Sequence, residues 1–176
     1  MNKTGLLVID VQPVFMAPEP MWTRDGDDLV TKCADLIDRA RRADVPVLFV
    51  RHIGESGQYA GDDPRFGIHP GLALSPGEPV VEKRFGSAFV ETDLEAILRG
   101  RGIGRLVVCG LATDGCVNAT VLHARCLSYD VTVIADAHAT SGSPDVVPAE
   151  IVAAFNAAWE RIGVTVVPAA LLTLRF

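Results

Sequence analysis

The sequence has no long apolar run, no excess of positive charge and few aromatic residues. No segment approaches the roughly 20 consecutive apolar residues that cross a bilayer, so we expect no transmembrane helix. The 22 acidic residues outnumber the 16 Lys and Arg residues, and the net charge of −6 argues against a nucleic-acid or anionic membrane partner. Aromatic residues make up only 6% of the chain, so few of them are available to fill a core.

Cysteine is also scarce, and its spacing shows no metal or redox pattern. The four cysteines lack C-x-x-C spacing, and Cys33, Cys109 and Cys126 fit the apolar faces of expected elements. The apolar run at residues 5–9 is too short for a signal peptide and is followed by a charged residue. We therefore expect a reduced, cytoplasmic protein with one functional thiol, Cys116.

Common metal and dinucleotide motifs are missing as well. His52 and His69 lie in an irregular segment without D-x-H or H-x-x-x-H pairing. The glycine-rich stretch 100–104 ends a helical pattern and precedes a strand, whereas a dinucleotide-binding loop follows a strand and opens a helix. We expect neither a metal ion nor a cofactor.

Short apolar runs alternate with helical periodicity along the chain. Helical patterns cover residues 27–43, 92–100, 116–127 and 148–162, and a Thr92–Glu95 capping box opens the second. Because strand–helix–strand units build parallel sheets, we predict a single α/β domain over residues 1–176, a three-layer αβα, Rossmann-like fold with an open six-stranded parallel sheet. The expected strands are residues 5–9, 46–51, 79–82, 106–109, 131–135 and 164–167.

Residues 52–77 interrupt this alternation. The segment is rich in glycine, proline, aspartate and serine and has no sustained period. Long irregular loops in compact domains usually carry function, so we expect a lid or binding loop over the end of the second strand.

The stretch 105–127 presents a cysteine after a sharp turn. An apolar strand, a glycine-bearing turn at 110–115 and a helix that begins near Cys116 follow one another. The unpaired N–H groups and the dipole at a helix start favour negative charge. The sequence therefore predicts a lowered pKa for the Cys116 thiol.

Two other polar residues follow predicted strands. Asp10 follows the first strand and Lys83 the third, and ligands in such sheets bind beyond the carboxyl ends of the strands. A base, a cation and a thiol at one sheet edge fit acyl transfer. Asp10 would take the thiol proton, Cys116 would attack a carbonyl carbon, Lys83 would keep Asp10 ionised, and backbone N–H groups of the turn would bind the oxyanion.

Three separated motifs resemble one known family over nearly the whole chain. GLATDGCV at 110–117, VIDVQ at 8–12 and EKRFGSAF at 82–89 are similar to motifs of the isochorismatase-like cysteine hydrolases, which include nicotinamidases and N-carbamoylsarcosine amidase. The run ADAHAT at 135–140 looks most like the branch that contains streptothricin hydrolase. The metal-dependent nicotinamidases carry an aspartate and closely spaced histidines after the second strand, where this chain reads RHIGES.

The resemblance implies specific roles for several residues. It implies a catalytic triad of Asp10, Lys83 and Cys116 and a cis peptide bond between Leu111 and Ala112. It further implies an oxyanion hole formed by the N–H groups of Ala112 and Cys116. Relatives commonly form dimers or tetramers, so the resemblance also implies a homo-oligomer.

Three functions remain open from the sequence. The leading hypothesis is a metal-independent cysteine hydrolase that cleaves the C–N bond of a small amide, carbamoyl or lactam substrate through a thioester. The second is an isochorismatase-type vinyl-ether hydrolase, which needs Asp10 as an acid but no thiol nucleophile. The third is a noncatalytic ligand-binding scaffold of the same fold.

A further set of side chains is a candidate for substrate binding. The aromatic members are expected as pocket walls and the polar members as contacts, although a role in the core or at its rim is equally compatible with the sequence. The candidates are Phe15, Trp22, Phe85 and Phe89 as walls, with Gln12, His138 and Ser141 as polar contacts.

Overall fold

The structure, a computed structural model, describes residues 3–16, 26–142 and 145–174. A six-stranded parallel sheet in the order β3-β2-β1-β4-β5-β6 runs through the molecule. This confirms the predicted α/β fold. The strands are β1 (Lys3–Ile9), β2 (Val47–His52), β3 (Val80–Lys83), β4 (Ile103–Leu111), β5 (Asp130–Ala139) and β6 (Thr165–Val167).

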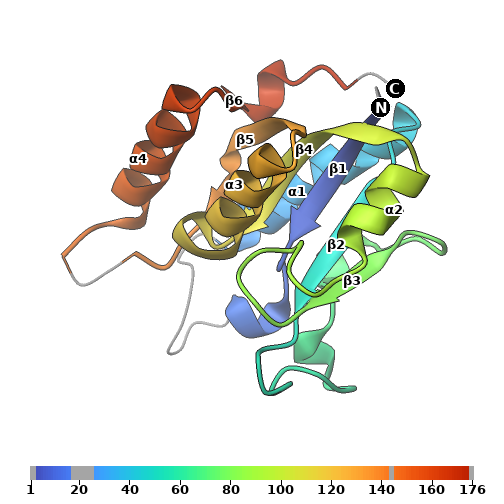
Figure 1. Cartoon of the computed structure of the whole chain (residues 1–176). Coiled ribbons are helices and arrows are strands. Elements are labelled where there is room, and N and C mark those ends of the chain that lie inside the picture. The colour runs from blue at the N-terminus through green and yellow to red at the C-terminus, as the bar shows by residue number, and fades with distance from the viewer. Residues whose placement is uncertain (1–2, 17–25, 143–144, 175–176) are drawn as a thin grey trace.

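Helices cover both faces of the sheet (Figure 1). Helix α1 (Gly26–Arg42) packs on one face. Helices α2 (Leu94–Gly100), α3 (Asn118–Cys126) and α4 (Pro148–Arg161) pack on the other. None of the described helices is both long and apolar enough to cross a membrane.

The central strand β1 shows why its sequence is apolar without alternation. Leu6 and Val8 pack into the core under α1, whereas Leu7 and Ile9 pack into the core under α2 and α3. All four side chains are buried, since each face of the strand meets a helical layer.

The topology creates a crevice at the carboxyl end of β1. The chain moves outward from β1 to β2 and β3, then returns to place β4 on the opposite side of β1. Ligands of open α/β sheets bind at such a reversal point, because the connections leave in opposite directions there. The ends of β1 and β4 therefore border the expected site.

Strands β4 and β5 are longer than the sequence predicts. Their pairing continues through Gly110–His138 and Leu111–Ala139 after a register irregularity between Val108 and Gly110. The apolar run in β5 stops at a polar residue, but backbone pairing does not. His138 thus lies in β5, whereas the sequence ends the expected strand at residue 135.

The predicted capping box at Thr92–Glu95 is wrong. Asp93 occupies the N-cap position of α2 and makes no side-chain cap hydrogen bond. The Thr92 hydroxyl instead donates to the Ala88 carbonyl at 2.5 Å and accepts from the Leu94 N–H at 3.3 Å. The Thr92 hydroxyl thus links the preceding loop to the first residue of the helix by hydrogen bonds.

The segment after β2 is irregular, as predicted. It contains two short 3₁₀ turns, at Pro64–Phe66 and Pro70–Leu72. The side chain of Asp63 accepts a hydrogen bond from the Arg65 N–H, and His69 Nδ1 accepts one from the Gly71 N–H. The loop is thus organised by local side-chain caps, which simple periodicity does not report.

Candidate active site

Three strand ends bring the predicted aspartate, lysine and cysteine together. Asp10 follows β1, Lys83 is the last residue of β3, and Cys116 lies in the turn after β4. Lys83 Nζ is 2.7 Å from Asp10 Oδ2 and 3.0 Å from Cys116 Sγ. The ammonium therefore bridges the carboxylate and the thiol.

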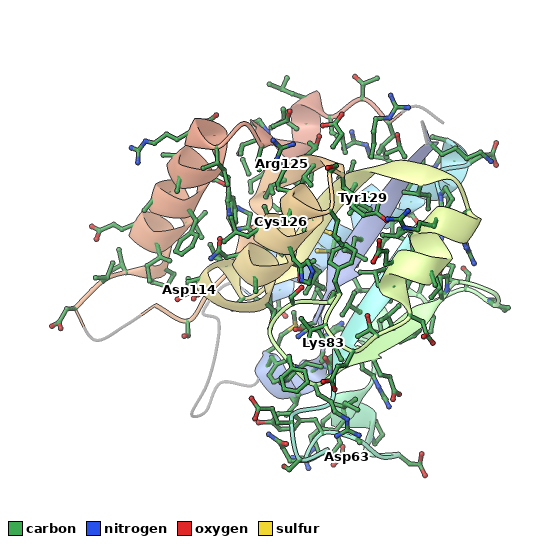
Figure 2. The ribbon with its side chains drawn as sticks, viewed as in Figure 1. Asp63, Lys83, Asp114, Arg125, Cys126 and Tyr129 are labelled. Carbon is green, nitrogen blue, oxygen red and sulfur yellow. The ribbon has the colours of Figure 1, made fainter. Side chains whose placement is uncertain are left out.

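The Lys83 ammonium is buried among polar atoms. Its side chain is 0% exposed, and Figure 2 shows it within the molecule, whereas Asp63 lies at the outer end of the loop after β2. Besides its contacts with the aspartate and the thiol, Nζ lies 3.1 Å from His52 Nδ1 and 3.1 Å from the Phe85 carbonyl oxygen. These partners offset the desolvation of the charge, which otherwise costs several kcal/mol.

Asp10 has an uncommon backbone conformation and one open carboxylate oxygen. Its φ of 52° lies in the left-handed region that non-glycine residues seldom adopt. Oδ1 is buried and makes no hydrogen bond with any described residue. Burial raises the pKa of this carboxyl, and the charge of Lys83 opposes the shift only in part. A carboxylate with a raised pKa is a stronger base, and Oδ1 is the atom open to a proton.

The thiol of Cys116 is not activated in the free protein, contrary to the prediction from the sequence. Burial, followed by the charge of Asp10, raises the thiol pKa to about 11, although Lys83 acts in the opposite direction. The residue also sits in a π-helical turn, Thr113–Val117, that precedes α3. At neutral pH the thiol form therefore predominates, and an oxygen of Asp10 within 4.8 Å of the sulfur is a candidate acceptor for its proton.

This electrostatic arrangement predicts slow alkylation of the free protein. At pH 7.5 we expect iodoacetamide to modify the exposed Cys126 before Cys116, and the Cys116 rate to keep rising toward pH 11 because the thiolate is the nucleophile. Asp10→Asn removes the negative charge that raises the thiol pKa, so it should move the Cys116 rate profile to lower pH. Peptide mass spectrometry over a pH series measures both rates. A Cys116 rate that levels off below pH 8 would contradict the raised pKa.

The turn after β4 closes one side of the site. The Leu111–Ala112 peptide bond is cis. The Ala112 carbonyl accepts hydrogen bonds from the N–H groups of Gly115 and Val117 at 3.0 and 3.1 Å. This carbonyl is therefore engaged within the turn, as an oxyanion site requires, because a carbonyl aimed at the oxyanion would repel it.

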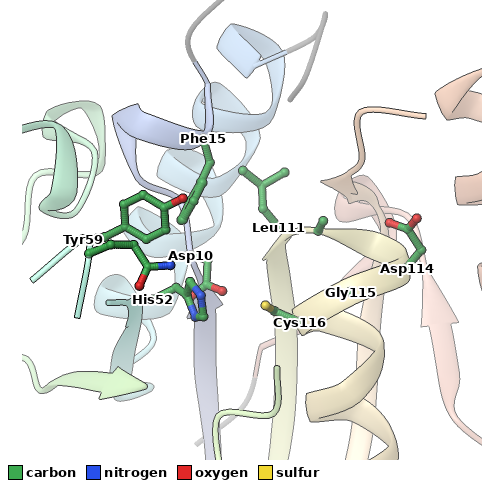
Figure 3. Close-up of a pocket in the computed structure, with 10 residues that line it drawn as sticks. Asp10, Phe15, His52, Tyr59, Leu111, Asp114, Gly115 and Cys116 are labelled. Atoms are coloured by element: carbon green, nitrogen blue, oxygen red, sulfur yellow. The ribbon is translucent and has the colours of Figure 1, made fainter. Parts of the chain in front are cut away.

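A pocket of about 400 Å³ lies between the end of β1 and this turn (Figure 3). Aromatic rings form one wall, with the Phe15 and Tyr59 centroids 5.4 Å apart and the His52 ring 6.1 and 6.2 Å from them. The turn forms the opposite wall. The lining residues are Asp10, Phe15, His52, Gln58, Tyr59, Leu111, Ala112, Asp114, Gly115 and Cys116.

The aromatic candidates from the sequence divide between pocket and core. Phe15 lines the pocket. Phe89 packs in the core with its ring 5.8 Å from that of Tyr129, and Phe85 reaches the site only through its carbonyl group. Trp22 lies outside the described residues.

Two polar candidates lie away from the pocket. His138 bonds Thr113 Oγ1 and Asn156 Oδ1, each at 2.9 Å, so it connects the turn after β4 with α4. The extension of β5 explains this position, since it keeps His138 inside the sheet. Ser141 is exposed and donates to the Gly142 carbonyl.

Gln12 has a structural contact pattern and does not line the pocket. Its fully buried amide accepts from the His52 N–H at 2.7 Å and donates to the carbonyl oxygens of His52 and Phe66 at 3.2 and 2.7 Å. The side chain therefore ties the segment after β1 to the loop after β2.

Six of the lining residues were not among the predicted catalytic, oxyanion-hole or substrate-binding residues: His52, Gln58, Tyr59, Leu111, Asp114 and Gly115. Three of them come from the end of β2 and the loop after it, which the sequence did predict as a functional loop. His52 ends β2 in direct register with Lys83 on β3. A register of this kind depends on the pairing of distant strands, so no local signal reports it.

A cluster of possible metal ligands coincides with this site. One oxygen of Asp10, one nitrogen of His52 and the sulfur of Cys116 lie within 4.8 Å of one another. Lys83 Nζ contacts all three residues at 2.7–3.1 Å, so an ammonium already occupies the space between these possible ligand atoms. A metal ion at that point would have to displace the Lys83 side chain, and the donor set therefore fits an ammonium better than a metal.

Comparison with known proteins gives a consistent result over the chain. The isochorismatase domain model matches residues 4–163. A streptothricin hydrolase of Streptomyces noursei is 36% identical over 154 residues, covering 82% of this chain and 60% of that relative. The chain thus spans less than two thirds of the length of that curated relative. An uncharacterized isochorismatase family protein of Bacillus subtilis is 33% identical, with 93% and 94% covered.

Solved structures agree with the sequence relatives. The crystal structure of an isochorismatase from Pseudomonas putida superposes with a TM-score of 0.86 at 32% identity, covering 97% of this chain and 90% of that one. A cysteine hydrolase from Pseudomonas syringae gives a TM-score of 0.88 at 27% identity, with 96% and 89% covered.

Proposed function

This chain belongs to the isochorismatase family of cysteine hydrolases, and we propose that it cleaves the C–N bond of a small amide, carbamoyl or lactam substrate through a thioester on Cys116. The observation that carries the proposal is the buried contact of Lys83 with both Asp10 and Cys116 beside a pocket of about 400 Å³. The streptothricin hydrolase and ureidoacrylate amidohydrolase among its relatives are named for hydrolytic reactions, which supports this class.

The proposed acylation step uses Asp10 as the base and then as the acid. The thiol proton moves to Oδ1 while the sulfur forms a bond with the carbonyl carbon, and the N–H groups of Ala112 and Cys116 hold the oxyanion. When the tetrahedral intermediate collapses, the C–N bond breaks and Asp10 gives its proton to the departing nitrogen. Ammonia or an amine leaves, and the acyl group remains on the sulfur.

Deacylation repeats the same transfers with water. Asp10 takes a proton from a water molecule as the water oxygen bonds to the thioester carbon. The C–S bond then breaks, the acid product forms, and the proton returns to the sulfur. The Lys83 ammonium stabilises each negative charge that develops beside it.

The charges of the pocket support the amide reaction over the vinyl-ether alternative. Among the described lining residues there are two carboxylates and no lysine or arginine. Asp10 is paired with Lys83, whereas Asp114 accepts a hydrogen bond only from the neutral Thr140 hydroxyl, at 2.7 Å. Isochorismate carries two carboxylates, which this pocket does not compensate. Neutral and cationic amides fit it better.

Ammonia release from three matched amides tests both the reaction and this preference. Succinamide, β-alaninamide and succinamate differ mainly in the charge at the end remote from the scissile amide. We expect kcat/KM to be about tenfold lower for the anionic succinamate than for succinamide, because it brings a carboxylate near Asp114. Asp114→Asn should reduce the difference in kcat/KM between succinamide and succinamate. Release of no ammonia from a wider set of small amides, with a thiol that never acquires an acyl mass, would refute the amidase proposal.

A further inference from the structure

We propose that His52 is a fourth member of the reactive centre, which receives a hydrogen bond from Lys83 at Nδ1 and donates one from Nε2 to an acceptor atom on the substrate. This inference rests on the amidase function proposed above and names the substrate class more closely. It assigns to this pocket small neutral amides with a carbonyl, ether or ring-nitrogen acceptor next to the scissile carbonyl.

The backbone of His52 is fixed from both sides. Gln12 accepts from its N–H and donates to its carbonyl oxygen, and the Gln12 side chain is itself fully buried. On the other side, His52 pairs in register with Lys83 of β3. A side chain on such a backbone has a set direction, which a loop histidine lacks, because each backbone polar group is already engaged.

Contact with Lys83 determines the tautomer of the ring. An ammonium has three donors and no acceptor, so His52 Nδ1, 3.1 Å from Nζ, must accept. The ring proton then sits on Nε2. Burial, followed by the charge of Lys83, lowers the pKa of His52 to about 4, so the ring stays neutral at physiological pH. The charged or titratable groups around it are Lys83, Asp10, Cys116 and Tyr59.

The Nε2–H group has no partner within the described residues, and the ring lines the pocket. Figure 3 shows the ring beside Asp10, with the sulfur of Cys116 facing both from the opposite wall. A ring nitrogen lies within 4.8 Å of that sulfur. The attacked carbon sits about 3–3.5 Å from the sulfur, and an imidazole that lines the same pocket can direct its Nε2–H toward atoms one or two bonds from that carbon.

The Phe15 and Tyr59 rings limit where the imidazole can point. Both flank it, at centroid distances of 6.1 and 6.2 Å, and both line the same pocket. A hydrogen bond from a donor in a partly apolar wall contributes more binding free energy than one made in water. A substrate without the acceptor leaves that donor unpaired and binds more weakly. This is the condition under which one hydrogen bond selects a substrate.

Substrate-free NMR tests the tautomer directly. A long-range ¹H–¹⁵N correlation spectrum of the protein, assigned with His52→Asn, should show an unprotonated Nδ1 and a protonated Nε2, unchanged from pH 8 to pH 5.5. A proton on Nδ1, or a charged ring in this range, would overturn the proposal. The measurement needs no turnover, so it remains decisive even if every amide proves inert.

A pair of isosteric amides tests the contact with substrate. Pyruvamide carries a carbonyl oxygen where isobutyramide has a methyl group. His52→Asn keeps an acceptor for Lys83 but has no group at the Nε2 position, and His52→Gln places an amide N–H near that position. We expect His52→Asn to lower kcat/KM about tenfold more for pyruvamide than for isobutyramide, and His52→Gln to restore most of the difference.

The outcomes separate this inference from the amidase proposal. Equal losses for the two amides in His52→Asn, at unchanged melting temperature, would show that His52 only supports the structure. Hydrolysis of neither amide, nor of any other, would refute the amidase function, while the NMR spectrum still decides the state of His52.

Discussion

Replacement of Cys116 by alanine is expected to reduce amide hydrolysis by about 10³-fold or more, because Cys116 carries the only thiol among the described residues that line the pocket. Cys116→Ser should lose most activity, since a hydroxyl is a weaker nucleophile than a thiol in this environment. Ammonia release, with the melting temperature as a check on folding, measures the effect.

Two companion variants make this test selective. Cys126→Ala removes an exposed cysteine of α3 and should leave the rate unchanged. Asp10→Asn should abolish amide hydrolysis as well, since the carboxylate carries every proton transfer. An isochorismatase-type reaction gives a different pattern, with Asp10→Asn inactive and Cys116→Ala active. Retained amide turnover in both Cys116 variants would eliminate the thioester route.

The second large effect is expected from Gly110→Ala, which should destabilise the protein by about 4 kcal/mol or more. Gly110 has a φ of +124°, and an added Cβ would lie 2.0 Å from the Ile9 carbonyl oxygen. The clash is with the backbone of β1, so no side-chain rotation relieves it. A protein of this size should then melt roughly 10 °C lower.

Gly100→Ala is the matched control. Gly100 ends α2, has no positive φ, and an added Cβ there would have no neighbour within 4 Å. Alanine should therefore be neutral or stabilise the helix by up to about 1 kcal/mol. Thermal and urea unfolding followed by circular dichroism measure both variants. Similar melting temperatures for the two variants would show that the close contact between β1 and β4 is not needed for the stability of the protein.

The strands and the residues Asp10, Lys83 and Cys116 could be predicted from the sequence because local patterns of apolar and polar residues indicate them. Leu6 to Ile9 form an unbroken apolar run since both faces of β1 are covered, and Asp10 marks where that run ends. Asp10 and Cys116 follow strands and Lys83 ends one, and parallel topology places such positions at one edge of the sheet. The apolar runs and the polar residues that end them were sufficient to predict these features.

The remaining features depend on contacts between distant segments. The role of His52 requires its register with Lys83, and the pKa of Cys116 is set by burial and by Asp10, more than 100 residues away in sequence. The predicted strand stopped short of His138 because the apolar pattern of β5 ends before its backbone pairing does. The proposed homo-oligomer likewise depends on surfaces that one chain does not define, and it stays a prediction.

The crowded environment of Lys83 has a consequence for the catalytic cycle. Within the described residues its nitrogen meets four acceptors, from Asp10, His52, Phe85 and Cys116, but an ammonium has only three hydrogens. While the sulfur is free, one of the four acceptors receives no hydrogen bond from Lys83. Once the sulfur is acylated it accepts poorly, and the three hydrogens then match the three remaining partners. In the proposed cycle, the covalent intermediate is thus the stage at which the hydrogens of the Lys83 ammonium and its remaining acceptors are equal in number.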